Sequence, residues 1–312
     1  MTVAPDLRAR TWGGHRLAPP GDEPIGEAWI AGPTSRVDRG AFAGRTLDDL
    51  AAELGAALVG TAAPVPGRFP LLVKLLDPAA WLSVQVHPDD ATARRLAGAG
   101  ACGKTEAWYV LDADPGAELL AGVRPGEDPE AVRSLVRRGG ADLADRLARH
   151  RVGPGDTLLI PAGTLHTVGP GLLLYEVQQP SDLTYRVYDW GRPATPGRQL
   201  HLAEAEASVD PAATVEPARP PRGGGRATVV RCAHFALDVV DLGDEAAALD
   251  PAGRSVHLLT VAEGCVAVEG GAGADRWRID RARLDTVVVP AGAGGYQIVA
   301  RGPARVLLAL LP

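Results

Sequence analysis

An eight-residue pattern occurs twice in this chain and constrains its fold more than any other feature. Residues 156–163 read DTLLIPAG, and residues 285–292 read DTVVVPAG, 129 positions later. A short apolar run that ends in a Pro-x-Gly turn is typical of a β-strand leading into a corner. Two copies at this separation predict two β-domains related by duplication.

The rest of the chain favours β-structure as well. Glycine (38 residues) and proline (27 residues) are abundant, and the apolar runs between them are short. Such runs occupy residues 71–76, 158–160, 172–177, 258–261 and 286–289. Short strands separated by turn residues predict a mainly β protein, built as a sandwich or a barrel.

Three segments predict helices instead. Residues 46–58 start with a capping-box pattern and carry apolar residues at helical spacing, and residues 89–96 predict a short helix. Residues 129–151 predict a helix pair broken at two consecutive glycines. We therefore expect a small helical insertion at about residues 127–151 of the first domain.

A proline- and glycine-rich stretch, PARPPRGGGR at residues 217–226, predicts the linker between the domains. The expected first domain is residues 1–216, and the second is residues 227–312. Shifting the repeat by 129 positions places Gly295 where the first copy has His166. We therefore expect a degenerate second domain that lacks metal ligands.

Charge and composition exclude several classes of protein. The net charge of -6 offers no basic patch for nucleic acid or an anionic membrane, and no apolar run reaches the ~20 residues of a membrane span. The N-terminal residues lack a charged-then-apolar leader pattern. Three widely spaced cysteines form no disulfide framework. We expect a cytoplasmic protein.

Five polar residues have the spacing of a metal site. Gln85 and His87 are two positions apart, so on a strand their side chains share one face. Lys104 and Glu106 have the same spacing. His166 closes a Gly-x5-Pro-x-Gly-x2-His run, in which glycine and proline turn the chain and the histidine projects into the mouth of the barrel.

One carboxylate, two imidazoles and an amide oxygen suit Zn²⁺, with Mn²⁺, Fe²⁺ or Co²⁺ as substitutes. A single histidine is more often a packed or surface residue than a ligand, so the inference rests on the joint spacing. The remaining histidines show no partner pattern and are interpreted as structural or surface residues: His15, His150, His201, His234 and His257.

Lysine is almost absent from the chain. Of 32 basic residues, only Lys74 and Lys104 are lysines, and both fall beside the candidate metal residues. A compact, flexible ammonium differs from a guanidinium in how readily its pKa shifts on burial. A functional role for both is one interpretation, and coincidence is the other.

These motifs resemble a known family. Gly-x5-Pro-x-Gly-x2-His is the second signature motif of the cupin superfamily, and the ordered blocks resemble type I mannose-6-phosphate isomerases in their short bacterial form. The blocks are WGG (12–14), IGEAW (25–29), LLVKLLD (71–77), LSVQVHPDD (82–90), GKTEAWY (103–109), PAGTLH (161–166) and EVQQPSDLTYRVYDW (176–190). As in this family, glutamine replaces the first cupin histidine, and the glutamate lies nineteen residues beyond His87.

The resemblance implies two cupin-like, jelly-roll β-barrels and one zinc ion per chain. Its zinc ligands would be Gln85, His87, Glu106 and His166. The enzyme would interconvert mannose 6-phosphate and fructose 6-phosphate through a metal-stabilised cis-enediol, as a monomer or homodimer with a small sugar phosphate as its partner.

The resemblance also assigns residues around the metal. Arg186 corresponds to the family's catalytic arginine, and Lys104 and Glu176 line the same pocket. Ser83 and Lys74 are the expected substrate-binding residues. In the C-terminal domain the resemblance is confined to the Pro-Ala-Gly turn and to Tyr296 after it.

Aldose–ketose isomerisation needs an electrophile at the carbonyl, a base near C1 and C2, and a clamp for the phosphate. Glu176, Lys104 and a metal-bound water all remain candidates for the base. Arg186 suits bidentate contact with an oxyanion, but a structural ion pair with Asp182 or Asp189 is the alternative.

Two other functions remain open at this point. A non-catalytic cupin that binds sugar phosphates would have no need of both metal ligands and acid–base groups. A cupin oxygenase shares the chemistry of two histidines and a carboxylate, but it would normally keep the first histidine, which Gln85 replaces here.

Overall fold

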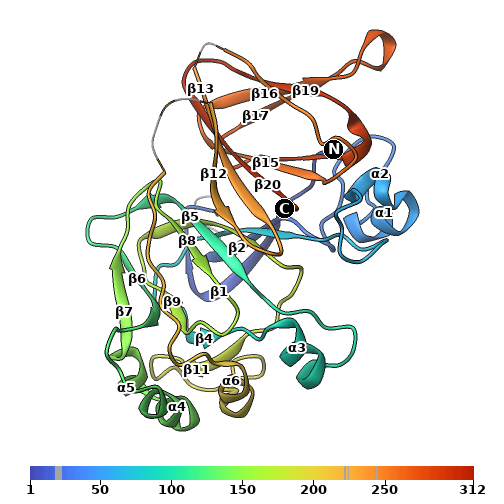
Figure 1. The fold of residues 1–312 in the computed structure, drawn as a ribbon. Helices are drawn as coiled ribbons and strands as arrows, with labels where there is room; N and C mark the ends of the chain where they lie inside the picture. The colour runs from blue at the N-terminus through green and yellow to red at the C-terminus, as the bar shows by residue number, and fades with distance from the viewer. Residues whose placement is uncertain (18–22, 221–222, 224, 244) are drawn as a thin grey trace. The chain divides into compact units, whose positions relative to one another are not determined.

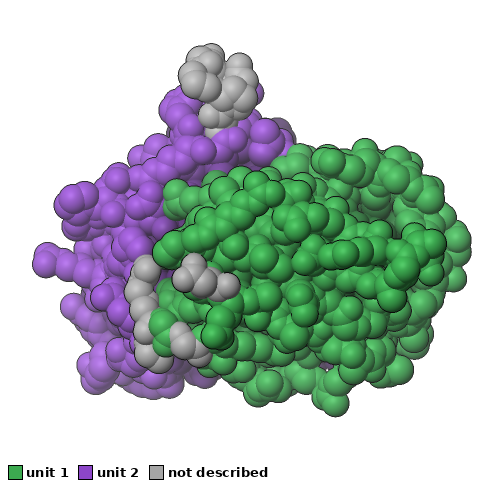
Figure 2. All heavy atoms as spheres, turned by 90° about the horizontal axis from the view of Figure 1, so that it is seen from above, with its two compact units in different colours: residues 1–6, 29–74, 220–312 green, residues 7–28, 75–219 purple. Residues whose placement is uncertain are grey.

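The computed structural model describes residues 1–17, 23–220, 223, 225–243 and 245–312. They divide into two units, coloured separately in Figure 2: unit 1 is residues 1–6, 29–74 and 220–312, and unit 2 is residues 7–28 and 75–219. The sequence placed residues 1–6 and 29–74 with the first domain instead.

Long-range backbone hydrogen bonds account for this difference. The Met1 amine donates to the Val288 carbonyl at 2.7 Å, and the Val288 amide donates to Met1 O at 2.9 Å. Likewise, the Val256 amide donates to Val59 O at 3.1 Å. Pairings between such distant segments leave no local sequence pattern.

Unit 2 is built on two antiparallel sheets (Figure 1). The first has the order β1 (Asp6–Gly14), β2 (Ile25–Ala31), β3 (Leu72–Leu76), β10 (Leu172–Gln178), β5 (Glu106–Ala113), β8 (Thr157–Ile160). The second has the order β11 (Tyr185–Tyr188), β4 (Val84–Val86), β9 (His166–Val168), β6 (Glu118–Val123), β7 (Leu147–Arg151). The chain passes between the units within β2 and β3.

The helices of unit 2 are α3 (Asp90–Ala97), α4 (Pro129–Arg138), α5 (Ala141–Ala144) and α6 (Leu202–Ser208). The predicted break in the helix pair is confirmed, because Gly139 ends α4 at φ 66°, a conformation that favours glycine. The prediction of helix up to residue 151 is wrong. Residues 147–151 form β7, in which burial alternates along the strand, a period of two that the arginine-rich sequence obscured.

Unit 1 also contains two antiparallel sheets. The first has the order β12 (Gly225–Arg231), β13 (Ala236–Leu242), β20 (Ala304–Leu310), β15 (His257–Glu263), β18 (Thr286–Val289). The second has the order β14 (Ala247–Leu249), β19 (Tyr296–Ala300), β16 (Cys265–Gly270), β17 (Trp277–Ala282). This unit also contains two single-turn 3₁₀ helices, η1 (Gly273–Asp275) and η2 (Ala291–Ala293).

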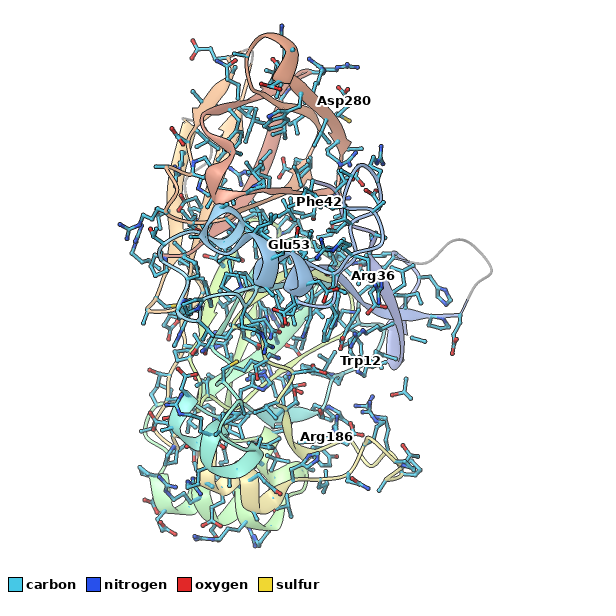
Figure 3. All side chains as sticks on the ribbon, turned by 90° about the vertical axis from the view of Figure 1, so that its right-hand side faces the viewer. Trp12, Arg36, Phe42, Glu53, Arg186 and Asp280 are labelled. Atoms are coloured by element: carbon cyan, nitrogen blue, oxygen red, sulfur yellow. The ribbon has the colours of Figure 1, made fainter. Side chains whose placement is uncertain are left out.

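The helix predicted at residues 46–58 is divided in two: α1 (Leu47–Leu54) and α2 (Ala56–Val59). Thr46 and Asp49 form the predicted capping box at the start of α1. Glu53, labelled in Figure 3, pairs with Arg45 at 2.5 Å. Gly55, at φ 52°, separates the two helices.

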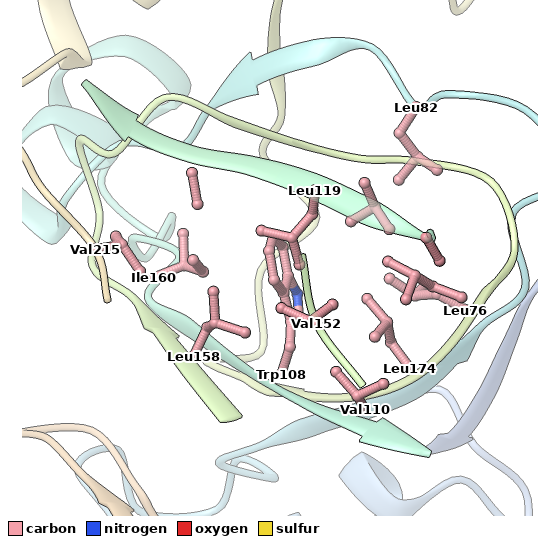
Figure 4. Close-up of a cluster of buried hydrophobic side chains, with 14 of the residues drawn as sticks. Leu76, Leu82, Trp108, Val110, Leu119, Val152, Leu158, Ile160, Leu174 and Val215 are labelled. Carbon is pink, nitrogen blue, oxygen red and sulfur yellow. The ribbon is translucent and has the colours of Figure 1, made fainter. Parts of the chain in front are cut away.

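Each unit buries its own apolar core. In unit 2, Trp108 lies within a cluster that includes Leu119, Leu158 and Leu174 (Figure 4). The strands β5 and β10 that border it are buried along nearly their whole length, so their sequences are almost continuously apolar. The mainly β, cupin-like architecture is confirmed. Within the described ranges, every helix is too short or too polar to cross a membrane.

The strand registers of the two units correspond. In unit 2, Glu106 at the start of β5 lies opposite Ile160 at the end of β8. In unit 1, His257 at the start of β15 lies opposite Val289 at the end of β18. Ile160 and Val289 are equivalent in the sequence repeat, so His257 takes the position of Glu106.

The same comparison corrects which residue of unit 1 is equivalent to His166. His166 lies opposite Gln85 on β4 and Ala121 on β6, whereas the matching partners in unit 1, Leu249 and Gly270, face Tyr296. The turn after the repeated proline is one residue longer in unit 1. Tyr296, and not Gly295, therefore occupies the position of His166.

His257 should make the stability of unit 1 depend on pH. Burial lowers the pKa of His257 to about 4, and its Nδ1 lies 2.9 Å from the Tyr296 hydroxyl. The unfolded chain binds this proton near pH 6.5, so stability present above that pH is lost as the pH falls toward 4. From pH 7 to pH 5, this one group should lower the free energy of unfolding by about 2 kcal/mol.

Urea unfolding of the wild type and of His257→Asn at both pH values measures this loss. The variant is expected to lose about 2 kcal/mol less than the wild type between pH 7 and pH 5. Equal losses in the two proteins would show that His257 is not held neutral by the fold.

Candidate metal centre

Strand ends in unit 2 bring the candidate ligands to one place. Glu106 is the first residue of β5, and His166 is the first residue of β9. Gln85 lies in the middle of β4, directly opposite His166, and His87 follows the end of that strand. The side chains of Gln85, His87 and His166 therefore come together, as the spacing of two and the corner before His166 predicted.

His87, Glu106 and His166 form a tight, buried group. One ligand atom from each lies within 4.8 Å of the others. His87 Nε2 is 3.4 Å from Glu106 Oε2, and His166 Nε2 is 3.3 Å from Glu106 Oε1. In the part of the chain that the structure describes, this is the one such group of His, Cys, Asp and Glu.

Backbone carbonyls orient both imidazoles. His87 Nδ1 donates to Leu183 O at 2.8 Å, and His166 Nδ1 donates to Thr164 O at 2.9 Å. Each ring then presents the lone pair of Nε2 toward Glu106. A carbonyl that fixes the tautomer in this way is the usual support of a metal-binding histidine.

Protonation states also suit a metal. Burial, reinforced by the Lys104 ammonium, lowers the pKa of His87 to about 3, and burial lowers the pKa of His166. Burial by itself would raise the pKa of Glu106, but the Lys104 ammonium holds it well below its usual range. The group therefore consists of two neutral imidazoles and a carboxylate, the forms that bind cations.

Gln85 lies beside this group, but its amide nitrogen, and not its amide oxygen, faces His166. Its Nε2 is 3.1 Å from His166 Nε2, and its Oε1 accepts a hydrogen bond from Ser83 Oγ at 3.4 Å. The two ends of an amide are distinguished by their hydrogen bonds. As an oxygen ligand, Gln85 would present Oε1 in place of Nε2.

Lys104 supplies a buried positive charge. Its Nζ is 2.8 Å from Glu106 Oε2 and 3.1 Å from His87 Nε2. Burial would lower the pKa of this ammonium, but the carboxylates of Glu106 and Glu176 outweigh burial and raise it. Lys104 is thus a cation here, able to donate hydrogen bonds but not to accept a proton.

Glu176 approaches from the neighbouring strand β10, where it lies opposite Trp108 of β5. The Trp108 indole donates to Glu176 Oε2 at 2.9 Å. Sequence reasoning missed Trp108. Its position two residues after Glu106, on the same face of a strand, was the signal that could have identified it.

The donor set fits a divalent ion. Lys104 is close to Glu106, but neither oxygen of Glu106 accepts a well-aligned hydrogen bond from a described residue. A buried carboxylate with spare lone pairs beside two neutral imidazoles suits zinc and its chemical neighbours.

Arg186, labelled in Figure 3, lies opposite Gln85 on the adjacent strand β11. Its Nε donates to Ser83 Oγ at 3.2 Å, and its Nη1 donates to Gln199 O at 3.0 Å. Within the described residues it forms no ion pair with Asp182 or Asp189, so the structural alternative is not observed.

Lys74 is placed differently from the other candidates. It is a buried residue of β3 that belongs to unit 1, with its Nζ 5.1 Å from the centroid of the Trp29 ring. Its contact with substrate therefore stays a prediction. Ser83, by contrast, belongs to unit 2 and contacts both Gln85 and Arg186.

Comparisons with known proteins identify the family. The family model of the phosphomannose isomerase type I catalytic domain matches residues 7–113, which include Gln85, His87, Lys104 and Glu106. His166, Glu176 and Arg186 lie beyond that match.

Curated relatives extend the similarity. Mannose-6-phosphate isomerase of Streptococcus mutans is 40% identical over 215 residues, a segment that spans 65% of this chain and 65% of that protein. Mannose-6-phosphate isomerase ManA of Bacillus subtilis is 32% identical over 316 residues, 94% of each chain.

Solved structures share the fold over almost the entire chain. The mannose 6-phosphate isomerase from Bacillus subtilis has a TM-score of 0.80 at 28% identity and covers 99% of this chain and 98% of its own. A variant of phosphomannose isomerase from Salmonella typhimurium has a TM-score of 0.78 at 17% identity, over 99% and 98% of the two chains. The second likeness concerns the fold alone.

Proposed function

Because this chain belongs to the type I phosphomannose isomerase family, we propose that it interconverts mannose 6-phosphate and fructose 6-phosphate. The observation that carries the proposal is the buried group of His87, Glu106 and His166, with Lys104 against its carboxylate. A sugar phosphate is the proposed partner, and a cytoplasmic location is part of the same proposal.

The proposed cofactor is one Zn²⁺ per chain, held by His87, Glu106 and His166, with Gln85 as a fourth ligand after its amide turns. When bound, the ion would supply Lewis acidity to the substrate carbonyl and to the charge that develops in the enediol. Mn²⁺, Fe²⁺ and Co²⁺ are expected substitutes.

The remaining groups divide the proton chemistry. Lys104 is held protonated by Glu106 and Glu176, so its proposed role is to donate a hydrogen bond to a substrate oxygen. Glu176 then becomes the proposed base that moves a proton between C1 and C2 of the open-chain sugar. The indole of Trp108 would hold its carboxylate in place.

Arg186→Ala is expected to lower kcat/KM by about 10²–10³-fold while sparing the bound metal, because a donor to a substrate oxyanion is lost but no ligand is. A steady-state assay and metal analysis of one preparation measure both quantities. Arg137→Ala, at an exposed arginine of the same unit, should change neither. If metal content falls together with activity, Arg186 has a structural role instead.

A coupled assay of the pure, zinc-loaded protein against a small panel of sugar phosphates tests the proposed function. Conversion of mannose 6-phosphate and of fructose 6-phosphate is expected. No conversion of either would overturn it. The non-catalytic alternative is not favoured, because the relative that aligns over 94% of this chain is named as an isomerase. Calorimetry that showed tight sugar-phosphate binding with zero turnover would revive it.

A further inference from the structure

One buried carboxylate anchors the loop that follows Arg186. Asp189 is 5% exposed and lies just after β11. Arg198 donates to it three times, from Nε at 3.0 Å and from Nη2 at 2.6 and 2.8 Å. Arg192 adds bonds from Nε at 3.1 Å and from Nη2 at 2.7 Å. Both oxygens of Asp189 are thereby occupied.

The contact between Asp189 and Arg198 holds the residues that follow Arg198 against Arg186. The next residue, Gln199, accepts the hydrogen bond from Arg186 Nη1 at 3.0 Å. The His201 amide donates to Arg186 O at 2.8 Å, and the Arg186 amide donates to His201 Nδ1 at 3.3 Å. The orientation of the guanidinium therefore depends on where residues 198–201 are held.

The Arg192 contact reaches the other side of Arg186. Arg192 Nη2 donates to Trp81 O at 2.7 Å, and the Trp190 indole donates to Leu82 O at 2.5 Å. The next residue along the chain is Ser83, which accepts from Arg186 Nε. Trp190 adopts φ 55°, a conformation that L-residues keep only where surrounding contacts enforce it.

Charge gives Asp189 a second effect. The positive charge of Arg186 is disfavoured by two nearby guanidinium groups, those of Arg192 and Arg198. Burial and Arg198 lower the pKa of Arg186, Asp189 opposes this change, and Arg192 adds to it. Without the carboxylate, three guanidinium groups would repel one another at the end of β11.

We propose that Asp189 is a positioning residue for Arg186: it ties Arg198 and Arg192 to the end of β11, so that Gln199 O and Ser83 Oγ hold the guanidinium beside Gln85. Asp189 touches neither substrate nor metal ligand in this proposal. The link to catalysis rests on the proposed function, because Arg186 is taken to act on the sugar phosphate.

Asp189→Asn keeps the shape of the side chain and removes its charge, and two measurements test the consequence. Amide hydrogen exchange in residues 190–201 is expected to accelerate, while exchange in β5 and β8 is unchanged. Bound zinc should stay at the wild-type level, and kcat should fall roughly 10- to 100-fold because Arg186 is misplaced.

A double-mutant cycle separates positioning from general destabilisation. On an Arg186→Ala background, Asp189→Asn should change kcat less than about twofold, because the residue through which it acts is gone. A full, additive loss on that background overturns the proposal. Arg198→Gln removes the same contact from the other side and should give the same pattern, which keeps the test decisive if Asp189→Asn fails to fold.

Asp238→Asn provides a matched control, because Asp238 is a buried carboxylate bonded to Arg226 in unit 1. It should lower stability without lowering kcat.

If the wild type shows no turnover, the proposed function fails. The exchange comparison then still decides whether Asp189 holds residues 190–201, and unchanged exchange would overturn that claim by itself.

Discussion

His166→Ala is expected to remove the bound metal and the isomerase turnover together. The imidazole is completely buried, its Nε2 lies 3.3 Å from Glu106 Oε1, and among the described residues only His87 and Glu106 join it in the group of His, Cys, Asp and Glu. Loss of a ligand from a group of three should reduce kcat/KM by at least about 10³-fold, or ~4 kcal/mol of transition-state stabilisation. Metal analysis and a coupled assay of one sample measure both losses.

An exposed histidine of the same unit provides the control. His15→Ala should keep full metal content and full activity, because His15 lies on the surface. A His166→Ala protein that turned over sugar phosphate at the wild-type rate without metal would contradict the assignment of this centre.

Glu106→Gln should destabilise the metal-free protein by about 3–5 kcal/mol, because the buried ammonium of Lys104 loses the carboxylate 2.8 Å away. The neutral amide keeps the shape of the side chain but not its charge. Urea unfolding of chelated wild-type and variant proteins at pH 7 measures the difference in the free energy of unfolding.

A second variant identifies the cause. In the double variant Glu106→Gln with Lys104→Met, the ammonium that lost its nearest carboxylate is removed as well, so part of the lost stability should return, although the buried Glu176 carboxylate then loses the same cation. If the double variant is no more stable than Glu106→Gln alone, the destabilisation comes from packing and the charge argument fails.

The centre of unit 2 was largely predictable because its geometry is local. A spacing of two on a strand fixes which side chains share a face, and a Pro-x-Gly corner fixes where His166 emerges. The charge state of Lys104 was not predictable, since it depends on Glu106 and on Glu176, 70 residues further along the chain.

Other features could not be predicted from the sequence, because they depend on strand pairing and side-chain contacts between distant segments. One extra residue in a turn moved the equivalent of His166 from Gly295 to Tyr296, which only the strand register reveals. The partners of Asp189 are a similar case. Arginine is abundant in this chain, so nothing in the sequence distinguishes Arg198 from the others.

The most direct test of a zinc-dependent isomerase is a zinc titration of the metal-free protein in which bound ion and turnover of mannose 6-phosphate are measured together. We predict that formation of fructose 6-phosphate starts near zero, rises with bound zinc and saturates at one ion per chain. Turnover that is independent of zinc, or absent from the fully loaded protein, would contradict it.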